Sequence, residues 1–144
     1  MKVHLPQSIQ SPNDPIAEIL QEAKTIAVVG LSSNPARPSF VVAQYLQSVG
    51  YRIIPVNPNE KEVLGERAMA RLEDISEKVD LVDVFRRAEA VPPVARSAIQ
   101  IGARILWLQL GIEHSAAAEL ACAAGLTVIE DACLLVEHKK KRPH

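Results

Sequence analysis

The chain of 144 residues has little of what several classes of protein depend on. It contains two phenylalanines, two tyrosines and one tryptophan, too few for a nucleic-acid surface built on stacked aromatic rings. Its net charge is −1, so the overall field gives no reason to expect nucleic acid or an anionic membrane as a partner. No apolar run reaches about 18 residues, and we therefore predict no transmembrane span.

Signals for export, disulfides, metal sites and nucleophilic catalysis are absent as well. Residues 1–6 lack the apolar core of a signal peptide, so we expect a cytosolic protein. The two cysteines, Cys122 and Cys133, fit reduced thiols better than a disulfide framework. No CxxC or HxxxH spacing indicates a metal site. No GxSxG motif occurs either, and we assign no catalytic residue.

Short apolar runs alternate with amphipathic stretches along most of the chain. The runs predict strands at 25–29, 52–56, 81–85, 104–108 and 126–130, and the stretches predict helices at 15–23, 38–49, 90–101 and 115–124. Unbroken apolar strands that alternate with helices are typical of a parallel sheet covered on both faces. We therefore predict an α/β fold: a single doubly wound, Rossmann-like domain whose mostly parallel five-stranded sheet carries helices on both faces.

Both ends of the chain differ from this pattern. Residues 1–13 are polar with two prolines and are expected to form an N-terminal arm that includes His4. The domain itself is expected over 14–138, with Asp14 and Pro15 starting its first helix. Residues 139–144 form a basic tail, interpreted as a solvated and frayed terminus ending in His144. His114 and His138 are expected at the surface or as helix caps.

The segment 60–80 has the weakest pattern within the domain. Residues 63–66 suggest a short hairpin and residues 72–75 a helical turn.

The loop after the first strand, residues 30–39, is suited to phosphate. Gly30 allows a sharp turn and a close backbone approach. Ser32, Ser33 and Ser39 offer hydroxyl donors, and a helix starting near Pro38 offers free backbone N–H groups. Arg37 adds a charged fork. These residues predict a pyrophosphate site, although a serine-rich turn between strand and helix is also ordinary capping chemistry.

This loop departs from the usual dinucleotide fingerprint. Ser32 stands where a second glycine is expected, and the third glycine is missing. The second strand ends at Asn57, where an NAD-binding domain normally presents an acid to the ribose. Glu60 lies further along, in a proline-containing loop, and is a weak substitute. The departures argue against NAD and favour another phosphate-bearing nucleotide.

The loop after the third strand contains Phe85, Arg86 and Arg87. Phe85 is placed to cover an adenine, and the two arginines to pair with phosphates or to stack on the base. The residues alone are equally consistent with a Phe85 that closes the core and with solvated arginines that pair with Glu89.

Together these segments resemble a known family. Residues 26–32, 37–39, 56–58, 84–92 and 107–111 look like the motifs of the small stand-alone bacterial CoA-binding proteins, in the same order and spacing. Those proteins are similar to the CoA-binding domain of the succinyl-CoA synthetase α subunit. The resemblance runs from about Thr25 to His138, and it implies a Rossmann-like fold that binds coenzyme A.

The resemblance also implies which loops hold the ligand. The first loop would take the CoA phosphates, while the residues after the second and third strands would line the nucleotide pocket. The predicted cofactor-binding residues are Gly30, Ser32, Ser33, Arg37, Pro38, Ser39, Asn57, Pro58, Phe85, Arg86, Arg87 and Gln109. A synthetase-like phosphohistidine would belong to a separate domain, so His114 is not given that role.

The thiol of Cys133, near this predicted site, has two interpretations. Cys133 occupies a position at which the resembled family often has cysteine, although Leu134 follows here where proline is common. A thiol beside bound CoA can form a mixed disulfide if it has thiolate character. The alternative is a small buried hydrophobe, and we expect only packing from Cys122.

The sequence therefore favours a non-catalytic module that binds CoA or an acyl-CoA as a carrier, sensor or regulator. The alternative is a small nucleotide-dependent enzyme, either an NAD(P) oxidoreductase or a CoA-transfer enzyme completed by a partner subunit. A pure interaction domain is a weaker third interpretation, since the candidate ligand residues are intact.

Overall fold

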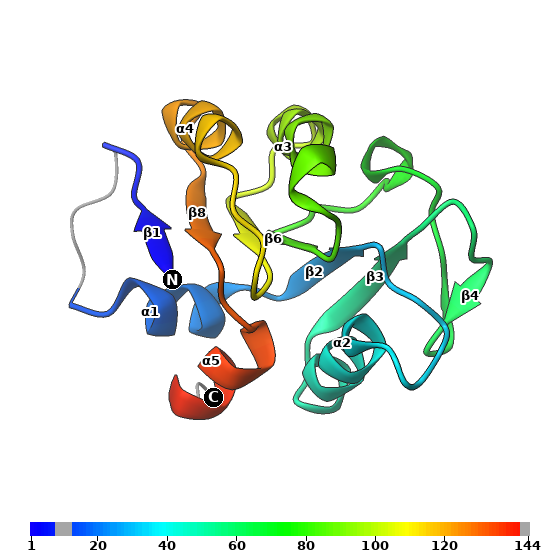
Figure 1. The fold of residues 1–144 in the computed structure, drawn as a ribbon. Coiled ribbons are helices and arrows are strands. Elements are labelled where there is room, and N and C mark those ends of the chain that lie inside the picture. Colours follow the sequence, from blue (N-terminus) through cyan, green and yellow to red (C-terminus); the bar gives the residue numbers. More distant parts are fainter. Residues whose placement is uncertain (8–12, 142–144) are drawn as a thin grey trace.

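A computed structural model of the protein describes residues 1–7 and 13–141. Its centre is a six-stranded sheet in the order β1-β8-β7-β6-β2-β3 (Figure 1). The strands are β1 (Lys2–His4), β2 (Thr25–Val29), β3 (Arg52–Val56), β6 (Leu81–Val84), β7 (Ile105–Leu108) and β8 (Thr127–Glu130). All neighbours pair in parallel except β1, which runs antiparallel to β8. The predicted Rossmann-like α/β fold is confirmed.

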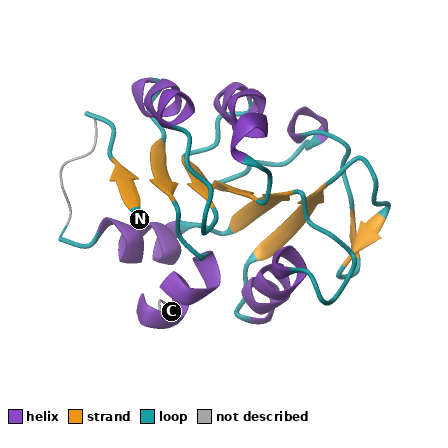
Figure 2. Cartoon of the chain, in the orientation of Figure 1, coloured by secondary structure: helices purple, strands orange, loops and turns teal. Residues whose placement is uncertain are grey.

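Helices cover both faces of this sheet, as Figure 2 shows. One face carries α1 (Pro15–Glu22), α2 (Pro38–Ser48) and α5 (Leu134–Lys141), and the other carries α3 (Val91–Gln100) and α4 (Ser115–Ala123). Each interface is a separate apolar cluster, because side chains of a strand alternate between the two faces. Leu81 and Trp107 belong to the α1/α2/α5 cluster, whereas Val82 and Leu106 belong to the α3/α4 cluster.

Helix starts and turns follow the local chemistry of the sequence. Asp14 caps α1 by accepting a hydrogen bond from the Ala17 N–H at 3.1 Å. Pro92 and Pro93 fall in the first turn of α3, where a missing N–H costs no intrahelical bond. The predicted hairpin consists of β4 (Glu62–Val63) and β5 (Glu66–Arg67), and the predicted helical turn is the 3₁₀ helix η1 (Leu72–Asp74).

The expected N-terminal arm is wrong for its first residues, which extend the sheet from five strands to six. Lys2 pairs with Glu130 and His4 with Val128 along the edge of β8. His4 Nε2 also lies 2.6 Å from a carboxylate oxygen of Glu130, so His4 is held in place. A strand of three residues is too short for its alternation to be recognised in sequence. Residues 8–12 of the expected arm lie outside the described residues.

The expected basic tail is likewise ordered in its first part. Residues 139–141 form the last turn of α5, and Lys141 Nζ pairs with Asp14 Oδ2 at 2.8 Å. His138 is buried in the same helix, with its Nδ1 2.6 Å from the Tyr45 hydroxyl, so the expected surface position is wrong. Burial lowers the pKa of His138. Residues 142–144, including His144, lie outside the described part of the chain.

The strand order identifies where a ligand site belongs. The chain passes from β2 to β3 on one side and then returns to β6 on the other side of β2. In such sheets a crevice opens beside the carboxyl ends of the two strands at which the order reverses. The residues that follow β2 and β6 are Gly30 and Phe85, which the sequence assigned to the ligand loops.

Candidate functional site

A cavity of about 890 Å³ lies at this switch point. Its volume falls within the range of small-molecule and cofactor sites, roughly 300–1,000 Å³. Most of the predicted cofactor-binding residues line it: Gly30, Ser32, Arg37, Pro38, Ser39, Asn57, Phe85, Arg86, Arg87 and Gln109. The folding of the sheet therefore brings the four loops together in one place.

Two predicted residues lie elsewhere. Ser33 is exposed, and its N–H donates to Glu60 Oε2 at 2.8 Å. Pro58 lines a smaller cavity of about 280 Å³ beside α3, which shares only Arg86 with the larger one. Glu60 is held by this contact with the first loop and does not line the larger cavity, so it is not placed as a ribose ligand there.

The hydroxyl groups of the first loop are set by the backbone around them. Ser39 Oγ accepts a hydrogen bond from the Ser32 N–H at 3.1 Å, and Ser32 Oγ accepts one from the Asn34 N–H at 3.0 Å. Each hydroxyl uses an oxygen lone pair in this contact and keeps its own proton for a further acceptor. The capping and phosphate interpretations are therefore compatible in this loop.

The start of α2 adds one backbone donor to the same loop. Arg37 occupies the N-cap position, and its carbonyl accepts from the N–H groups of Phe40 and Val41 at 3.1 and 3.2 Å. The first N–H groups of a helix have no partner within the helix and lie at its positive end. Pro38 at the first position has no N–H, so among the described residues the Ser39 N–H is the donor that this turn leaves for an anion.

Asn57 joins the second loop to the first. Its side-chain N–H donates to the Leu31 carbonyl at 3.1 Å, and its Oδ1 accepts from the Asn59 N–H at 3.0 Å. The side chain is buried, and both ends of its amide are engaged by neighbouring backbone groups. Asn57 therefore shapes the cavity wall as well as lining it.

Gly30 is required by a contact within the protein. Its φ is +87°, and a Cβ there would lie 2.4 Å from the carbonyl oxygen of Phe85. The first and third loops are thus in direct backbone contact. A side chain at position 30 would separate these loops, so a substitution there changes the shape of the cavity as well as the approach of a ligand.

The basic side chains at the cavity differ in their partners. Within residues 1–7 and 13–141, no carboxylate forms an ion pair with Arg37 or Arg86. Arg87 lies 3.5 Å from Glu89, and both side chains are exposed, so this pair contributes little to stability. Arg86 is half-buried and lines both cavities. Two unpaired guanidinium groups thus face space suited to an anion.

Phe85 combines the two roles that the sequence left open. It packs against the core cluster beneath α2 and α5, and it also lines the cavity. Its half-buried ring therefore closes the core while offering a surface to a ligand.

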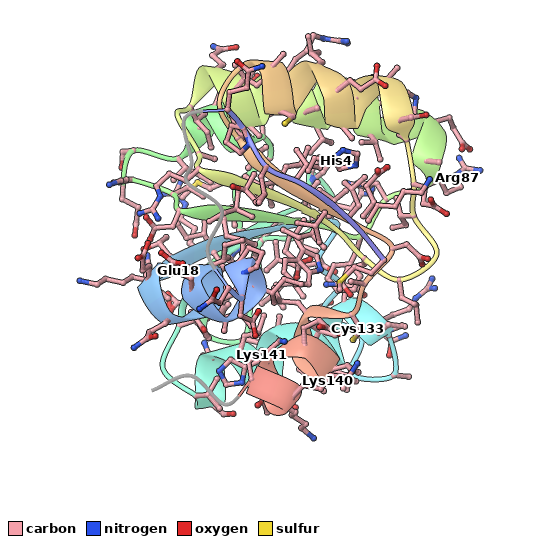
Figure 3. The ribbon with its side chains drawn as sticks, turned by 90° about the vertical axis from the view of Figure 1, so that its left-hand side faces the viewer. His4, Glu18, Arg87, Cys133, Lys140 and Lys141 are labelled. Carbon is pink, nitrogen blue, oxygen red and sulfur yellow. The ribbon has the colours of Figure 1, made fainter. Side chains whose placement is uncertain are left out.

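The opposite wall was only partly anticipated. It consists of residues 110–112 and Cys133, which stands before α5. Figure 3 shows Cys133 beside α5 and Arg87 near the other helix layer, so side chains from both layers reach the site. Asp131 Oδ1 accepts from the Gly111 N–H at 2.7 Å and fixes the loop. This contact depends on tertiary packing, and no local sequence pattern announces it.

Cys133 and Cys122 are both free and partly buried. Cys133 packs against the α1/α2/α5 core and lines the cavity, while Cys122 packs against the α3/α4 core. The position of Cys133 agrees with the thiol interpretation and with the packing one.

His114 caps α4, as expected. Its Nδ1 accepts from the Ala117 N–H at 3.1 Å.

One buried acid at the site was missed by sequence reasoning. Asp83 of β6 is fully buried, and its Oδ1 accepts a hydrogen bond from Gln109 Nε2 at 2.7 Å. Burial raises the pKa of Asp83 to about 7, while the hydrogen bond from Gln109 acts in the opposite direction. The sequence offered one signal for this residue, because Asp83 is an acid inside an otherwise apolar strand.

Across the described residues, no three His, Cys, Asp or Glu side chains gather in the manner of a metal site. None of the described helices combines the length and apolar character needed to cross a membrane.

Comparison with known proteins gives consistent matches. The family model of the CoA binding domain matches residues 24–139. The uncharacterized protein YneT of Bacillus subtilis is 45% identical over 123 residues, which span 85% of this chain and 91% of that protein. A hypothetical protein from Pyrococcus horikoshii has a similar structure, with a TM-score of 0.88, 33% identity and 99% of both chains covered. An ADP-forming acetate–CoA ligase of Archaeoglobus fulgidus is 32% identical over 81 residues, which are 55% of this chain and 12% of the ligase.

Proposed function

The chain belongs to the family of CoA-binding domains, and we propose that it binds coenzyme A or an acyl-CoA in the switch-point cavity. We propose further that it acts as a non-catalytic carrier, sensor or regulatory module. The observation that carries the proposal is one cavity at the strand-order reversal, lined by most of the residues that the sequence assigned to CoA.

The phosphates are assigned to the first loop. Arg37, the hydroxyl protons of Ser32 and Ser39, and the Ser39 N–H at the start of α2 supply donors there. Charge-assisted hydrogen bonds from such groups are stronger than neutral ones. Arg86 also lines the cavity and would provide a second guanidinium for the nucleotide end.

The remaining wall suits the less polar part of the ligand. Val42, Leu110 and Ile112 present apolar side chains, and Leu110 is 70% exposed at this surface. A large exposed apolar side chain beside a ligand cavity offers contact area to an alkyl chain. We assign this wall to the pantetheine arm and to any acyl group that it carries.

A second candidate is a CoA-transfer enzyme completed by a partner subunit. One observation favours it: the matched segment of the Archaeoglobus fulgidus protein is a small part of an ADP-forming acetate–CoA ligase. In this case the chain would supply CoA to a reaction centre on another polypeptide. Co-purification of a partner from native extract, together with ligase activity of the complex, would favour this candidate.

Calorimetric titration of the full chain with CoA, NAD⁺ and ATP tests the proposal. We expect selective binding of CoA. Absence of CoA binding, or a preference for NAD⁺, would contradict the assignment while leaving the fold unaffected.

Arg86→Ala tests the position of the ligand in the same assay. We expect CoA binding to weaken by about 1–3 kcal/mol, the cost of one hydrogen bond to a charged group. Arg96 is exposed on α3 and lines neither cavity, so Arg96→Ala serves as the matched control for loss of a positive charge. Equal effects of the two substitutions would remove Arg86 from the site.

A further inference from the structure

The buried pair Asp83–Gln109 reaches the cavity through Gln109. Asp83 is 0% exposed, and Gln109, which is 4% exposed, lines the cavity. The neighbours of Asp83 across the sheet are Val28 on β2 and Trp107 on β7. The Trp107 ring N–H donates to the Ala132 carbonyl at 2.9 Å and is not available to Asp83. Gln109 is thus the hydrogen-bond partner of this acid.

Asp83 Oδ2 has no partner at all. Among the described residues it is the buried side-chain polar atom that lacks a hydrogen bond. An unpaired buried polar atom of this kind lowers the stability of the folded state, and replacement by an apolar residue would remove that cost. A residue that lowers stability at the edge of a ligand cavity is a candidate for a role in binding.

The hydrogen bond fixes which end of the Gln109 amide faces the cavity. Asp83 Oδ1 accepts from Nε2 in the structure, and a carboxylate, which has no proton to donate, admits only this orientation of the amide. No donor within the described residues contacts Gln109 Oε1, and this atom is not among the buried polar atoms without a partner. The amide oxygen is therefore open to the cavity.

We infer that Asp83 is a positioning residue: it turns the Gln109 amide so that its oxygen accepts a hydrogen bond from an N–H group of the bound ligand. The inference rests on the proposed binding of CoA. Phosphate and pyrophosphate oxygens only accept hydrogen bonds, so this wall disfavours the anionic part of CoA. The N–H donors of CoA are the amides of its pantetheine arm and the amino group of adenine.

Three variants test the inference by calorimetric titration with CoA. Asp83→Val removes the acceptor and releases the Gln109 amide, and Gln109→Met removes the amide oxygen. Each is expected to weaken CoA binding roughly two- to ten-fold, the range for one hydrogen bond. Asp83→Asn retains an acceptor for Nε2 and is expected to stay within about two-fold of the wild type. Thermal melting of every variant checks that it is folded.

The double variant Asp83→Val/Gln109→Met separates positioning from general damage. If Asp83 acts through Gln109, the double variant binds CoA as well as Gln109→Met alone, since the two losses do not add. A full additional loss in the double variant would overturn the inference, as would unchanged CoA affinity in Asp83→Val. Unchanged affinity in Gln109→Met would overturn it even if Asp83→Val failed to fold.

Two fragments of the ligand identify the donor. Adenosine 3′,5′-bisphosphate carries the adenine amine without the pantetheine amides, and 4′-phosphopantetheine carries the amides without adenine. The substitutions should weaken binding only of the fragment that supplies the N–H group. If they weaken the binding of neither fragment, the inference is contradicted. Failure of the folded wild type to bind CoA would instead refute the proposed function, so the two failures are distinguishable.

Discussion

The buried carboxyl group of Asp83 makes a prediction about stability that needs no ligand. Burial raises its pKa from 3.8 to about 7 in the folded protein. The folded state therefore holds a proton that the unfolded state has already lost between these two pH values. Because the folded state binds more protons there, stability falls as pH rises from about 4 to about 7 and then levels off.

The size of the effect follows from the same values. Each pKa unit corresponds to about 1.4 kcal/mol, so a rise from 3.8 to about 7 amounts to roughly 4 kcal/mol in all. Most of the range between pH 5 and pH 8 lies on the falling part of this curve. The contribution of Asp83 should decrease by about 2 to 3 kcal/mol over that interval.

Asp83→Asn removes this titration while keeping the size of the side chain and an acceptor for Gln109. Urea unfolding of the wild type and the variant at pH 5, 6, 7 and 8 gives the difference in free energy of unfolding at each pH. Other titrating groups are common to both proteins and cancel in that difference. We expect the variant to gain about 2 to 3 kcal/mol relative to the wild type between pH 5 and pH 8.

A difference that stays constant with pH would refute the reasoning. It would mean that Asp83 has the same pKa in the folded and unfolded states, so that the carboxyl group is solvated in the native protein. A difference of the opposite sign would mean that a cation stabilises the buried carboxylate.

Three further predictions concern the cavity and the loops around it. Alkylation of Cys133 by iodoacetamide should slow when CoA is bound, while the rate at Cys122 stays unchanged; equal rates at Cys133 with and without CoA would place the ligand elsewhere. Gly30→Ala should lose more stability in urea unfolding than Gly65→Ala, by about 1–3 kcal/mol. Both glycines have positive φ, but a Cβ meets a neighbouring atom within 4 Å only at Gly30, so equal losses would mean that the close contact relaxes freely. Asp80→Ala should cost about 2 to 3 kcal/mol in the same assay, because it leaves two backbone N–H groups at the start of β2 without their acceptor, and a loss under 0.5 kcal/mol would contradict this.

The fold could be predicted because the signal is repeated along the chain. Apolar runs such as Thr25–Val29 and Leu81–Val84 are unbroken enough to indicate strands buried on both faces. Parallel strands place their carboxyl ends at one edge of the sheet, so residues after several strands gather without any local signal that links them. This is why the loops containing Gly30, Asn57 and Gln109 could be assigned to one site.

The two ends of the chain could not be predicted in the same way. Strand β1 has three residues, and its place at the edge of β8 depends on backbone pairing and on the contact between His4 and Glu130. Half of the residues of helix α5 are basic, and its last residues were predicted to form a frayed tail. No pattern in the sequence indicated that one side of this helix is buried, where His138 contacts Tyr45. Both errors arise because short or polar segments gain their structure from tertiary contacts.

The division of the site into separate loops was also too simple, and Gly30 shows why. The sequence suggested that this glycine lets a ligand approach the backbone, whereas the structure uses it to let two loops approach each other. The carbonyl of Phe85 occupies the space that a side chain at position 30 would need. The loop after β2 and the residue before Arg86 are therefore in direct contact, which limits the distance between the donors of the first loop and the guanidinium group of Arg86. A ligand that contacts both must match a spacing fixed by the protein before it binds, and such preorganisation lowers the entropic cost of binding.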